Sequence, residues 1–206
     1  MEKKIAVILG DGIGPEVTNQ SIKVLNMIAK QYGHQFSYEY ALMGAVAIDE
    51  TGNPLPDETI AICKNSDAIL FGAIGDPKYD NDPTAKVRPE QGLLKLRKEL
   101  QLFANIRPVK TYTSLQHLSP LKAKHLENVD FVIFRELTGG IYFGAKSLSE
   151  DGTVAKDDCS YSVMEIERVA HLAFQYAQKR NKHLTLVDKA NVLETSRLWR
   201  KVVQAI

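Results

Sequence analysis

The feature that most constrains the fold is an apolar segment that runs into a cluster of glycines and then into a helix. Residues 4–9, KIAVIL, are followed by Gly10, Gly12 and Gly14, which permit a tight turn. Pro15 suits the first helical position, since a backbone N–H has no partner there. Apolar residues then recur at helical spacing until Gly33, and we expect this face to be buried: Val17, Val24, Leu25, Ile28 and Tyr32. The segment predicts a strand, a tight turn and an amphipathic helix.

The rest of the chain also alternates short apolar runs with amphipathic stretches. We expect strands at 36–40, 67–74, 103–109, 130–137 and 183–187, and helices at 56–63, 89–100 and 194–206. A capping box formed by Ser162 and Glu165 opens a further helix, whose inward residues are Ile166, Val169, Ala170, Ala173 and Ala177. Residues 141–161 predict a protruding hairpin or arm. This order predicts an α/β fold with a domain boundary after Leu102.

Composition narrows the function classes. The 206 residues carry 26 basic and 25 acidic side chains, so no nucleic-acid partner and no anionic membrane partner is expected. No apolar run approaches the ~18 residues of a membrane span, and the apolar start is too short for a signal peptide. Cys63 and Cys159 stand far apart and are expected to be reduced thiols of a cytoplasmic protein. The histidines show no zinc-ligand spacing, so metal binding would require carboxylates.

The glycine turn at 10–14 is also a candidate anion site, because a helix N-terminus follows it. Its spacing is GxGxG rather than GxGxxG, and no acidic residue ends a second strand about 20 residues later, as a dinucleotide fingerprint requires. The alternative interpretation is a plain turn between a strand and a helix.

Three arginines are candidate carboxylate ligands: Arg97 on a predicted helix, and Arg107 and Arg135 on predicted strands. Arginine binds carboxylates through a planar fork and stays charged at any working pH. Each one alone could instead form a surface salt bridge. Arg135 favours a site, because an arginine at the end of so apolar a strand costs desolvation unless an anion meets it.

Lys189 and Tyr142 are candidate proton-transfer groups. Lys189 and Asn191 follow the predicted strand at 183–187, and ligands of α/β proteins gather at the carboxyl ends of strands. Lys189 could be a general base or could simply reach solvent. Tyr142, after Gly139 and Gly140, could be a proton donor or a packed residue of the arm.

Five stretches together resemble the β-decarboxylating hydroxy-acid dehydrogenases, the isocitrate/isopropylmalate dehydrogenase family: GDGIGPE at 10–16, RPEQGLLKLRKEL at 88–100, LFANIRP at 102–108, RELTGGIYFG at 135–144 and VDKANVLE at 187–194. Leu9 and Gln91 depart from the family's usual residues. The resemblance implies a two-domain α/β fold with mixed sheets flanked by helices, not a Rossmann fold. Residues 1–102 would begin the larger, cofactor-side domain, and residues 103–206 would form most of a dimer-forming domain with its arm at 141–161.

The resemblance also implies a reaction in which NAD oxidises the secondary alcohol of a malate derivative and carbon dioxide is then released. Arg97, Arg107 and Arg135 match substrate-carboxylate ligands, Lys189 matches the group that assists removal of the hydroxyl proton, and Tyr142 matches the group that protonates the enol. The residues matching the cofactor site are Asp76, Pro77, Lys78, Arg88, Pro89, Glu90 and Asn191. The resemblance further implies Mg²⁺ or Mn²⁺ and a homodimer.

The choice of substrate depends on Leu93, Leu94 and Val192, which match positions that contact an isopropyl group. The resemblance therefore favours isopropylmalate; isocitrate, homoisocitrate and tartrate are the alternatives. The leucines could instead be the buried face of their helix. No metal ligand can be assigned in this sequence, and the last helix ends without a stop signal. We therefore expect a fragment lacking the family's C-terminal part, with an inactive structural fragment as the rival hypothesis.

Overall fold

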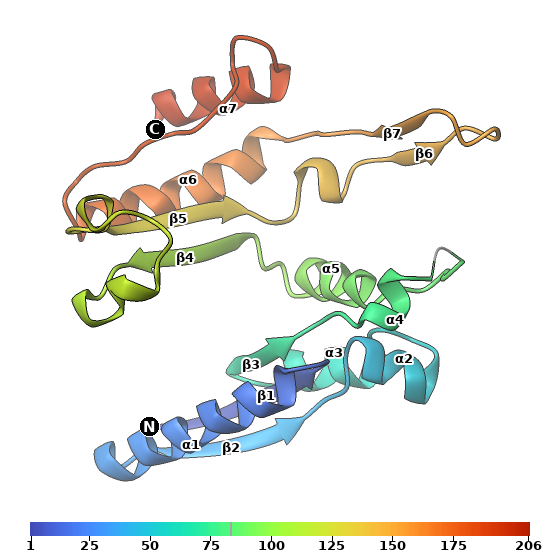
Figure 1. Cartoon of the computed structure of the whole chain (residues 1–206), viewed down its shortest axis with the longest axis vertical. Helices are drawn as coiled ribbons and strands as arrows, with labels where there is room; N and C mark the ends of the chain where they lie inside the picture. The colour runs from blue at the N-terminus through green and yellow to red at the C-terminus, as the bar shows by residue number, and fades with distance from the viewer. Residues whose placement is uncertain (83) are drawn as a thin grey trace. The chain divides into compact units, whose positions relative to one another are not determined.

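The computed structural model describes residues 1–82 and 84–206, so Pro83 of the predicted cofactor loop lies outside the described residues. The chain divides into two compact units, Met1–Leu100 and Gln101–Ile206. The division falls beside Leu102, where the sequence suggests a boundary. Helices and strands alternate in the first unit, which confirms the predicted α/β class (Figure 1).

The first unit is built on a parallel sheet with the strand order β2-β1-β3. Its strands are β1 (Glu2–Gly10), β2 (Gln35–Tyr40) and β3 (Ala68–Ala73), and its helices are α1 (Gly14–Tyr32), α2 (Ala45–Thr51), α3 (Asp57–Lys64), α4 (Pro77–Asp80) and α5 (Pro89–Glu99). β1 is the central strand, and its residues Ala6, Val7 and Ile8 are fully buried. The core cluster comprises Ala6, Ile8, Met43, Leu55, Ile60, Cys63 and Leu96.

The predicted inward face of α1 is wrong. Gly14 and Thr18 are buried, whereas Val17 is 47% exposed, Val24 59% and Tyr32 63%; Ile28 is also exposed and Leu25 only half-buried. The cause lies at the start of the helix, because a Cβ added to Gly14 would lie 2.1 Å from the Leu9 carbonyl oxygen. The helix therefore approaches β1 through its glycine, and residue 18 follows one turn later on the same face. Hydrophobic spacing alone identifies a shared face, not the neighbour that it meets.

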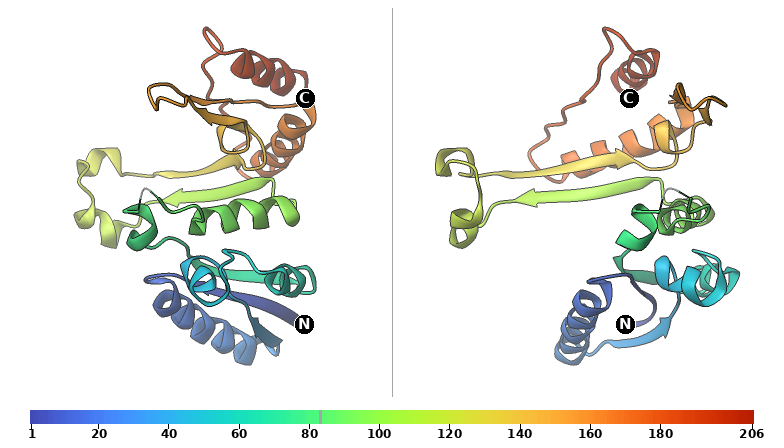
Figure 2. Two further views of the ribbon diagram at one scale, coloured as in Figure 1. Left: turned by 90° about the vertical axis from the view of Figure 1, so that its right-hand side faces the viewer. Right: turned by 45° about the vertical axis from the view of Figure 1, so that its right-hand side comes forward.

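The second unit contains an antiparallel pair, β4 (Ala104–Lys110) and β5 (Asp130–Glu136). The short 3₁₀ turns Thr113–Leu118 and Ala123–His125 connect them at one end (Figure 2). A hairpin of β6 (Lys146–Leu148) and β7 (Ala155–Asp157) lies within residues 141–161. Two helices follow, α6 (Val163–Gln178) and α7 (Glu194–Ala205).

The helix α6 begins at the predicted capping box, in which Ser162 Oγ accepts the Glu165 N–H at 3.3 Å and the Glu165 carboxylate accepts the Ser162 N–H at 2.7 Å. Ile166, Val169 and Ala170 are buried as expected, while Ala173 and Ala177 are half-buried. Ile166 and Ala170 form a core cluster with Val202 and Val203 of α7. α6 thus packs on α7. The ring of Phe134 in β5 meets the ring of Tyr176 in α6 edge-on, with 5.3 Å between the ring centres.

The predicted strand at 183–187 is wrong. These residues have no regular secondary structure, and Val187 is 90% exposed. Their β-branched and alternating sequence favours a strand, but a strand also needs a neighbour whose backbone can pair with it. No such neighbour lies beside this segment within the described residues. The helices α2 and α4 were not predicted, because each is too short to show a helical period.

Candidate functional site

The glycine turn after β1 carries a buried acid, Asp11, which is 6% exposed. Its carboxylate accepts the N–H groups of Ala45 at 2.9 Å, Val46 at 3.0 Å and Gly75 at 2.9 Å. Asp11 thereby caps the N-terminus of α2, whose own N-cap position is Gly44. Sequence reasoning missed this role because the partners lie 34 to 64 residues away. The only available signal was an acid between two glycines.

The predicted cofactor residues after β3 form a short structured loop. Asp76 caps α4 by accepting the Lys78 N–H at 2.9 Å. The Lys78 ammonium pairs with Asp49, and this hydrogen bond raises the pKa of Lys78 and lowers that of Asp49. Arg88 donates to the carbonyl oxygens of Tyr79 at 2.7 Å and Asp82 at 3.1 Å. Lys78 therefore ties the loop to α2, and Arg88 binds two carbonyl groups within the loop.

Glu90 occupies the first turn of α5 and is exposed, whereas the preceding Pro89 is buried. Its carboxylate faces Gly75, because a Cβ added there would lie 3.2 Å from Glu90 Oε1. Gly75 has a φ of +125°, a backbone conformation that residues other than glycine rarely adopt. An exposed carboxylate beside a bare backbone can accept hydrogen bonds from ligand hydroxyl groups.

The two leucines of α5 have different surroundings. Leu93 packs against the core cluster together with Leu100. Leu94 is half-buried and does not join that cluster. Both leucines share a helix face with Arg97, at four and three residues before it. Of the two, Leu94 is therefore the one beside the candidate substrate arginine that does not pack on the core cluster.

Arg107 and Arg135 share one face of the β4–β5 pair. The register places Asn105 directly opposite Arg135, and side chains at 105 and 107 point to the same face. Arg107 Nε donates to Asn105 Oδ1 at 2.5 Å. The Arg135 guanidinium lies 5.1 Å from the centre of the Tyr142 ring. The second unit thus assembles three predicted site residues, Arg107, Arg135 and Tyr142, while Arg97 belongs to the first unit.

A buried acid also follows this strand. The Glu136 side chain is 1% exposed and pairs with Arg168 of α6 at 2.9 Å. It accepts the N–H groups of Thr138 at 2.8 Å and Gly139 at 2.7 Å, and the Thr138 hydroxyl at 2.6 Å. Glu136 therefore fixes the turn that leads from Arg135 to Tyr142. Sequence reasoning missed it, although an acid ending an apolar strand was a usable signal.

Tyr161 supports the same turn from the other side. A Cβ added to Gly140 would lie 2.4 Å from the Tyr161 hydroxyl, and the φ of +75° at Gly140 also favours glycine. Tyr161 is half-buried, and this burial raises its pKa. Its ring meets Trp199 of α7 edge-on at 5.5 Å. The turn before Tyr142 is thus packed between Glu136 and Tyr161.

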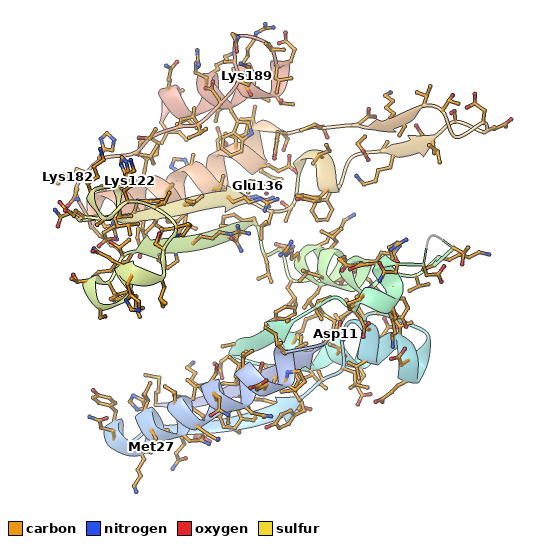
Figure 3. All side chains as sticks on the ribbon, viewed as in Figure 1. Asp11, Met27, Lys122, Glu136, Lys182 and Lys189 are labelled. Carbon is orange, nitrogen blue, oxygen red and sulfur yellow. The ribbon has the colours of Figure 1, made fainter. Side chains whose placement is uncertain are left out.

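Lys189 lies on the turn that precedes α7, and its side chain is exposed, as are those of Asn191 and Val192. Asp188, beside it, binds Arg200 of α7, and this hydrogen bond keeps the pKa of Asp188 below its ordinary value. Figure 3 shows Lys189 near the start of α7, apart from Glu136 at the end of β5. Tyr142 ends the 3₁₀ turn Gly140–Tyr142, so the two candidate proton-transfer groups of the second unit belong to separate elements.

In the described part of the chain, no three acidic, histidine or cysteine side chains gather closely enough to hold a metal ion. Across residues 1–82 and 84–206, none of the helices has the length and apolar character required to span a membrane.

This chain is similar to a known protein family and to several of its members. The family model described as isocitrate/isopropylmalate dehydrogenase matches residues 4–206. A 3-isopropylmalate dehydrogenase of Bacteroides fragilis is 58% identical over 204 residues, which are 99% of this chain and 57% of the relative. One of Bacillus subtilis is 53% identical over 210 residues, covering 100% of this chain and 57% of the relative. The chain thus spans somewhat more than half the length of these relatives.

Two solved structures have a similar fold. The crystal structure of isocitrate dehydrogenase from Methylococcus capsulatus matches with a TM-score of 0.82 and 28% identity, over 98% of this chain and 56% of that one. A β-decarboxylating dehydrogenase from Thermococcus kodakarensis matches with a TM-score of 0.70 and 32% identity, over 98% of this chain and 53% of that one. The chain belongs to the isocitrate/isopropylmalate dehydrogenase family.

Proposed function

We propose that the whole protein catalyses the NAD-dependent oxidative decarboxylation of 3-isopropylmalate to 2-oxoisocaproate (4-methyl-2-oxopentanoate), a step of leucine biosynthesis. The relatives named 3-isopropylmalate dehydrogenase support this substrate. The observation that carries the proposal is the pairing of Arg135 with Tyr142, with Arg107 on the same sheet face. It combines carboxylate recognition with a proton donor.

The arginines would bind the substrate's carboxylates. A guanidinium presents two parallel N–H groups, which match the two oxygens of a carboxylate. Arg135 is half-buried beside Tyr142, so a carboxylate held there would lie next to a phenol. The Tyr142 O–H could then protonate the carbon from which carbon dioxide has left. We assign Arg97 to the same substrate, together with Leu94 on its helix face.

NAD, when bound, accepts the hydride from the alcohol carbon. Among the predicted cofactor residues, Glu90 suits a ribose hydroxyl, because its exposed carboxylate faces the bare backbone of Gly75. Asp76, Pro77, Lys78, Arg88 and Pro89 would shape the surrounding loop, and Asn191 would contribute an exposed amide. Lys189, in its neutral form, would accept the proton of the substrate hydroxyl as the hydride leaves.

The resemblance also implies Mg²⁺ or Mn²⁺. The described residues offer no group of acidic side chains that could hold such an ion, so they do not fit a metal site by themselves.

We further propose a cytoplasmic homodimer that uses the β6–β7 hairpin. Leu148 and Val154 on this hairpin are 66% and 63% exposed, and apolar side chains displayed in this way suit a protein partner. The near-zero net charge favours neither a nucleic acid nor a membrane as partner.

An assay of the whole enzyme tests the function directly. With NAD and a divalent ion, it should produce NADH and carbon dioxide from 3-isopropylmalate, with a far higher kcat/KM than from isocitrate, homoisocitrate or tartrate. A preference for one of those acids would reassign the substrate within the same reaction class. Absence of NADH formation with all four would reject the proposed reaction.

Arg135→Lys should lower kcat/KM by a factor that corresponds to about 1.5 to 3 kcal/mol, because an ammonium cannot supply a two-point fork. Steady-state kinetics of the whole enzyme measure the loss. Arg180→Lys is the matched control: Arg180 pairs with Asp130 at the opposite end of β5 and has no assigned role. Equal kcat/KM for Arg135→Lys and the wild type would remove Arg135 from the site.

Leu94→Ser should reduce the selectivity for isopropylmalate over malate by about 1 to 3 kcal/mol, because the isopropyl group would lose an apolar contact. Leu93→Ser is the control: it should mainly lower the free energy of unfolding, since Leu93 packs on the core. The ratio of kcat/KM values and urea unfolding separate the two effects. If Leu94→Ser lowers kcat/KM for both substrates by the same factor, the leucine does not line the pocket.

A further inference from the structure

We propose that Asp188 and the α7 side chains Ser196, Arg197 and Arg200 are positioning residues for Lys189, holding its turn rigid while its amine stays accessible. The inference rests on the proposed function, which makes Lys189 a proton acceptor. It explains how an exposed turn can keep the Lys189 amine in a defined position.

The strongest contact joins Arg200 to Asp188. Arg200 Nε donates to Asp188 Oδ2 at 2.9 Å and Nη2 donates to Oδ1 at 2.7 Å, so the guanidinium binds both oxygens. The Asp188 side chain is 8% exposed, and Oδ1 also accepts the Ala190 N–H at 3.0 Å. One carboxylate therefore ties the residues on both sides of Lys189 to α7.

Two further side chains hold the backbone of Lys189 and its neighbour. Ser196 Oγ accepts the Lys189 N–H at 3.0 Å, and Arg197 Nε donates to the Ala190 carbonyl oxygen at 3.0 Å. The Lys189 carbonyl oxygen accepts the N–H groups of Val192 and Leu193, each at 3.0 Å. The Lys189 side-chain amine makes no hydrogen bond or ion pair to any other described residue.

The direction of these bonds distinguishes the arrangement from ordinary helix capping. A cap satisfies the free N–H groups at a helix start, but the N-cap residue of α7, Leu193, provides no side-chain acceptor. Here the side chains of the helix bind the donors and acceptors of the turn before it. Residues 196, 197 and 200 lie on one side of the helix, so all three reach the same turn. The turn is held by the helix, not the helix by the turn.

Rigidity at this position has a chemical consequence. A misplacement of about 1 Å in a reacting group can cost about 100-fold in rate. An exposed lysine has many rotamers, so fixing its backbone limits the space that its amine can sample. Loosening the turn should therefore lower the rate of hydride transfer while leaving substrate affinity nearly unchanged.

The test uses Arg200→Lys and Asp188→Asn in the whole enzyme, with Ser196→Ala as a milder variant that removes only the acceptor for the Lys189 N–H. Lys201→Gln, an exposed change on the same helix, is the matched control. Single-turnover NADH formation should fall roughly 10- to 100-fold in the first two variants, with KM little changed. The double variant Asp188→Asn/Arg200→Lys should lose no more than either single variant, because both break one contact.

Amide hydrogen exchange of Lys189 and Ala190 supplies a readout that does not depend on activity. It should accelerate in Arg200→Lys, Asp188→Asn and Ser196→Ala, and remain at the wild-type rate in Lys201→Gln. Normal hydride transfer in these three variants, beside a slow Lys189→Ala, would overturn the positioning role and leave the proposed function intact. Normal hydride transfer in Lys189→Ala itself would instead remove the role of Lys189.

Discussion

Glu136→Ala should lower the free energy of unfolding of the second unit by about 3 kcal/mol, the lower end of the cost of removing one partner from a buried ion pair, because the Arg168 side chain is 27% exposed. The Glu136 side chain is 1% exposed, and its loss leaves Arg168 without its carboxylate. It also removes the acceptor for the N–H groups of Thr138 and Gly139. Arg168 cannot compensate easily, because its Nε is already buried without a hydrogen bond in the described structure.

Urea unfolding followed by tryptophan fluorescence measures this change in stability with a probe close to Glu136. Trp199 is the single tryptophan of the chain and packs on Tyr161, beside the turn that Glu136 fixes. Glu150→Ala is the control, because Glu150 is exposed on the hairpin and should change stability by less than about 0.5 kcal/mol. Glu136→Gln should fall between the two, since it keeps one acceptor oxygen. An unchanged unfolding midpoint in Glu136→Ala would show that the network contributes nothing.

Local sequence patterns were sufficient for elements whose determinants are adjacent in the chain. The glycine turn, the start of α6 at its capping box and the end of α1 at Gly33 depend on residues within a few positions of each other. The strand β5 could also be predicted from the sequence, because its β-branched and aromatic residues are consecutive.

Patterns failed where a distant partner decides. The buried face of α1 is set in part by the approach of Gly14 to the backbone of Ala73 in β3, and residues 183–187 lack a pairing neighbour in the described structure. The same limit applies within the site. The position of Arg135 above Tyr142 follows from the turn fixed by Glu136, Arg168 and Tyr161, which are contributed by three separate segments.

The two acids that sequence reasoning missed have one role. Asp11 follows β1 and accepts N–H groups at the start of α2 and in the turn after β3, while Glu136 ends β5 and accepts those of the turn directly after it. Such turns carry most ligand contacts in α/β folds, and they lack the ladder that rigidifies strands. A buried carboxylate with several N–H donors supplies that rigidity. Tyr142, which is proposed to do chemistry, is thus exposed, while Glu136, which fixes the turn before it, is buried.

Lys189→Ala should slow hydride transfer about 10²- to 10⁴-fold, the usual contribution of a general base, whereas Tyr142→Phe should leave hydride transfer nearly intact. The two groups serve different protons: Lys189 takes one from the alcohol, and Tyr142 gives one to carbon after decarboxylation. Phenylalanine is the sharpest replacement at 142, because its ring keeps the contact with the Arg135 guanidinium and loses only the hydroxyl.

Single-turnover measurements on the whole enzyme separate the steps. In Tyr142→Phe, NADH should form at nearly the wild-type rate in the first turnover, while deuterium from solvent enters the product more slowly than NADH appears. In Lys189→Ala both signals should be slow together, because the first step limits the second. Lys201→Ala and Tyr112→Phe, both exposed and without an assigned role, are the controls. Normal NADH formation in Lys189→Ala, or slow NADH formation in Tyr142→Phe, would reverse the division of labour assigned here.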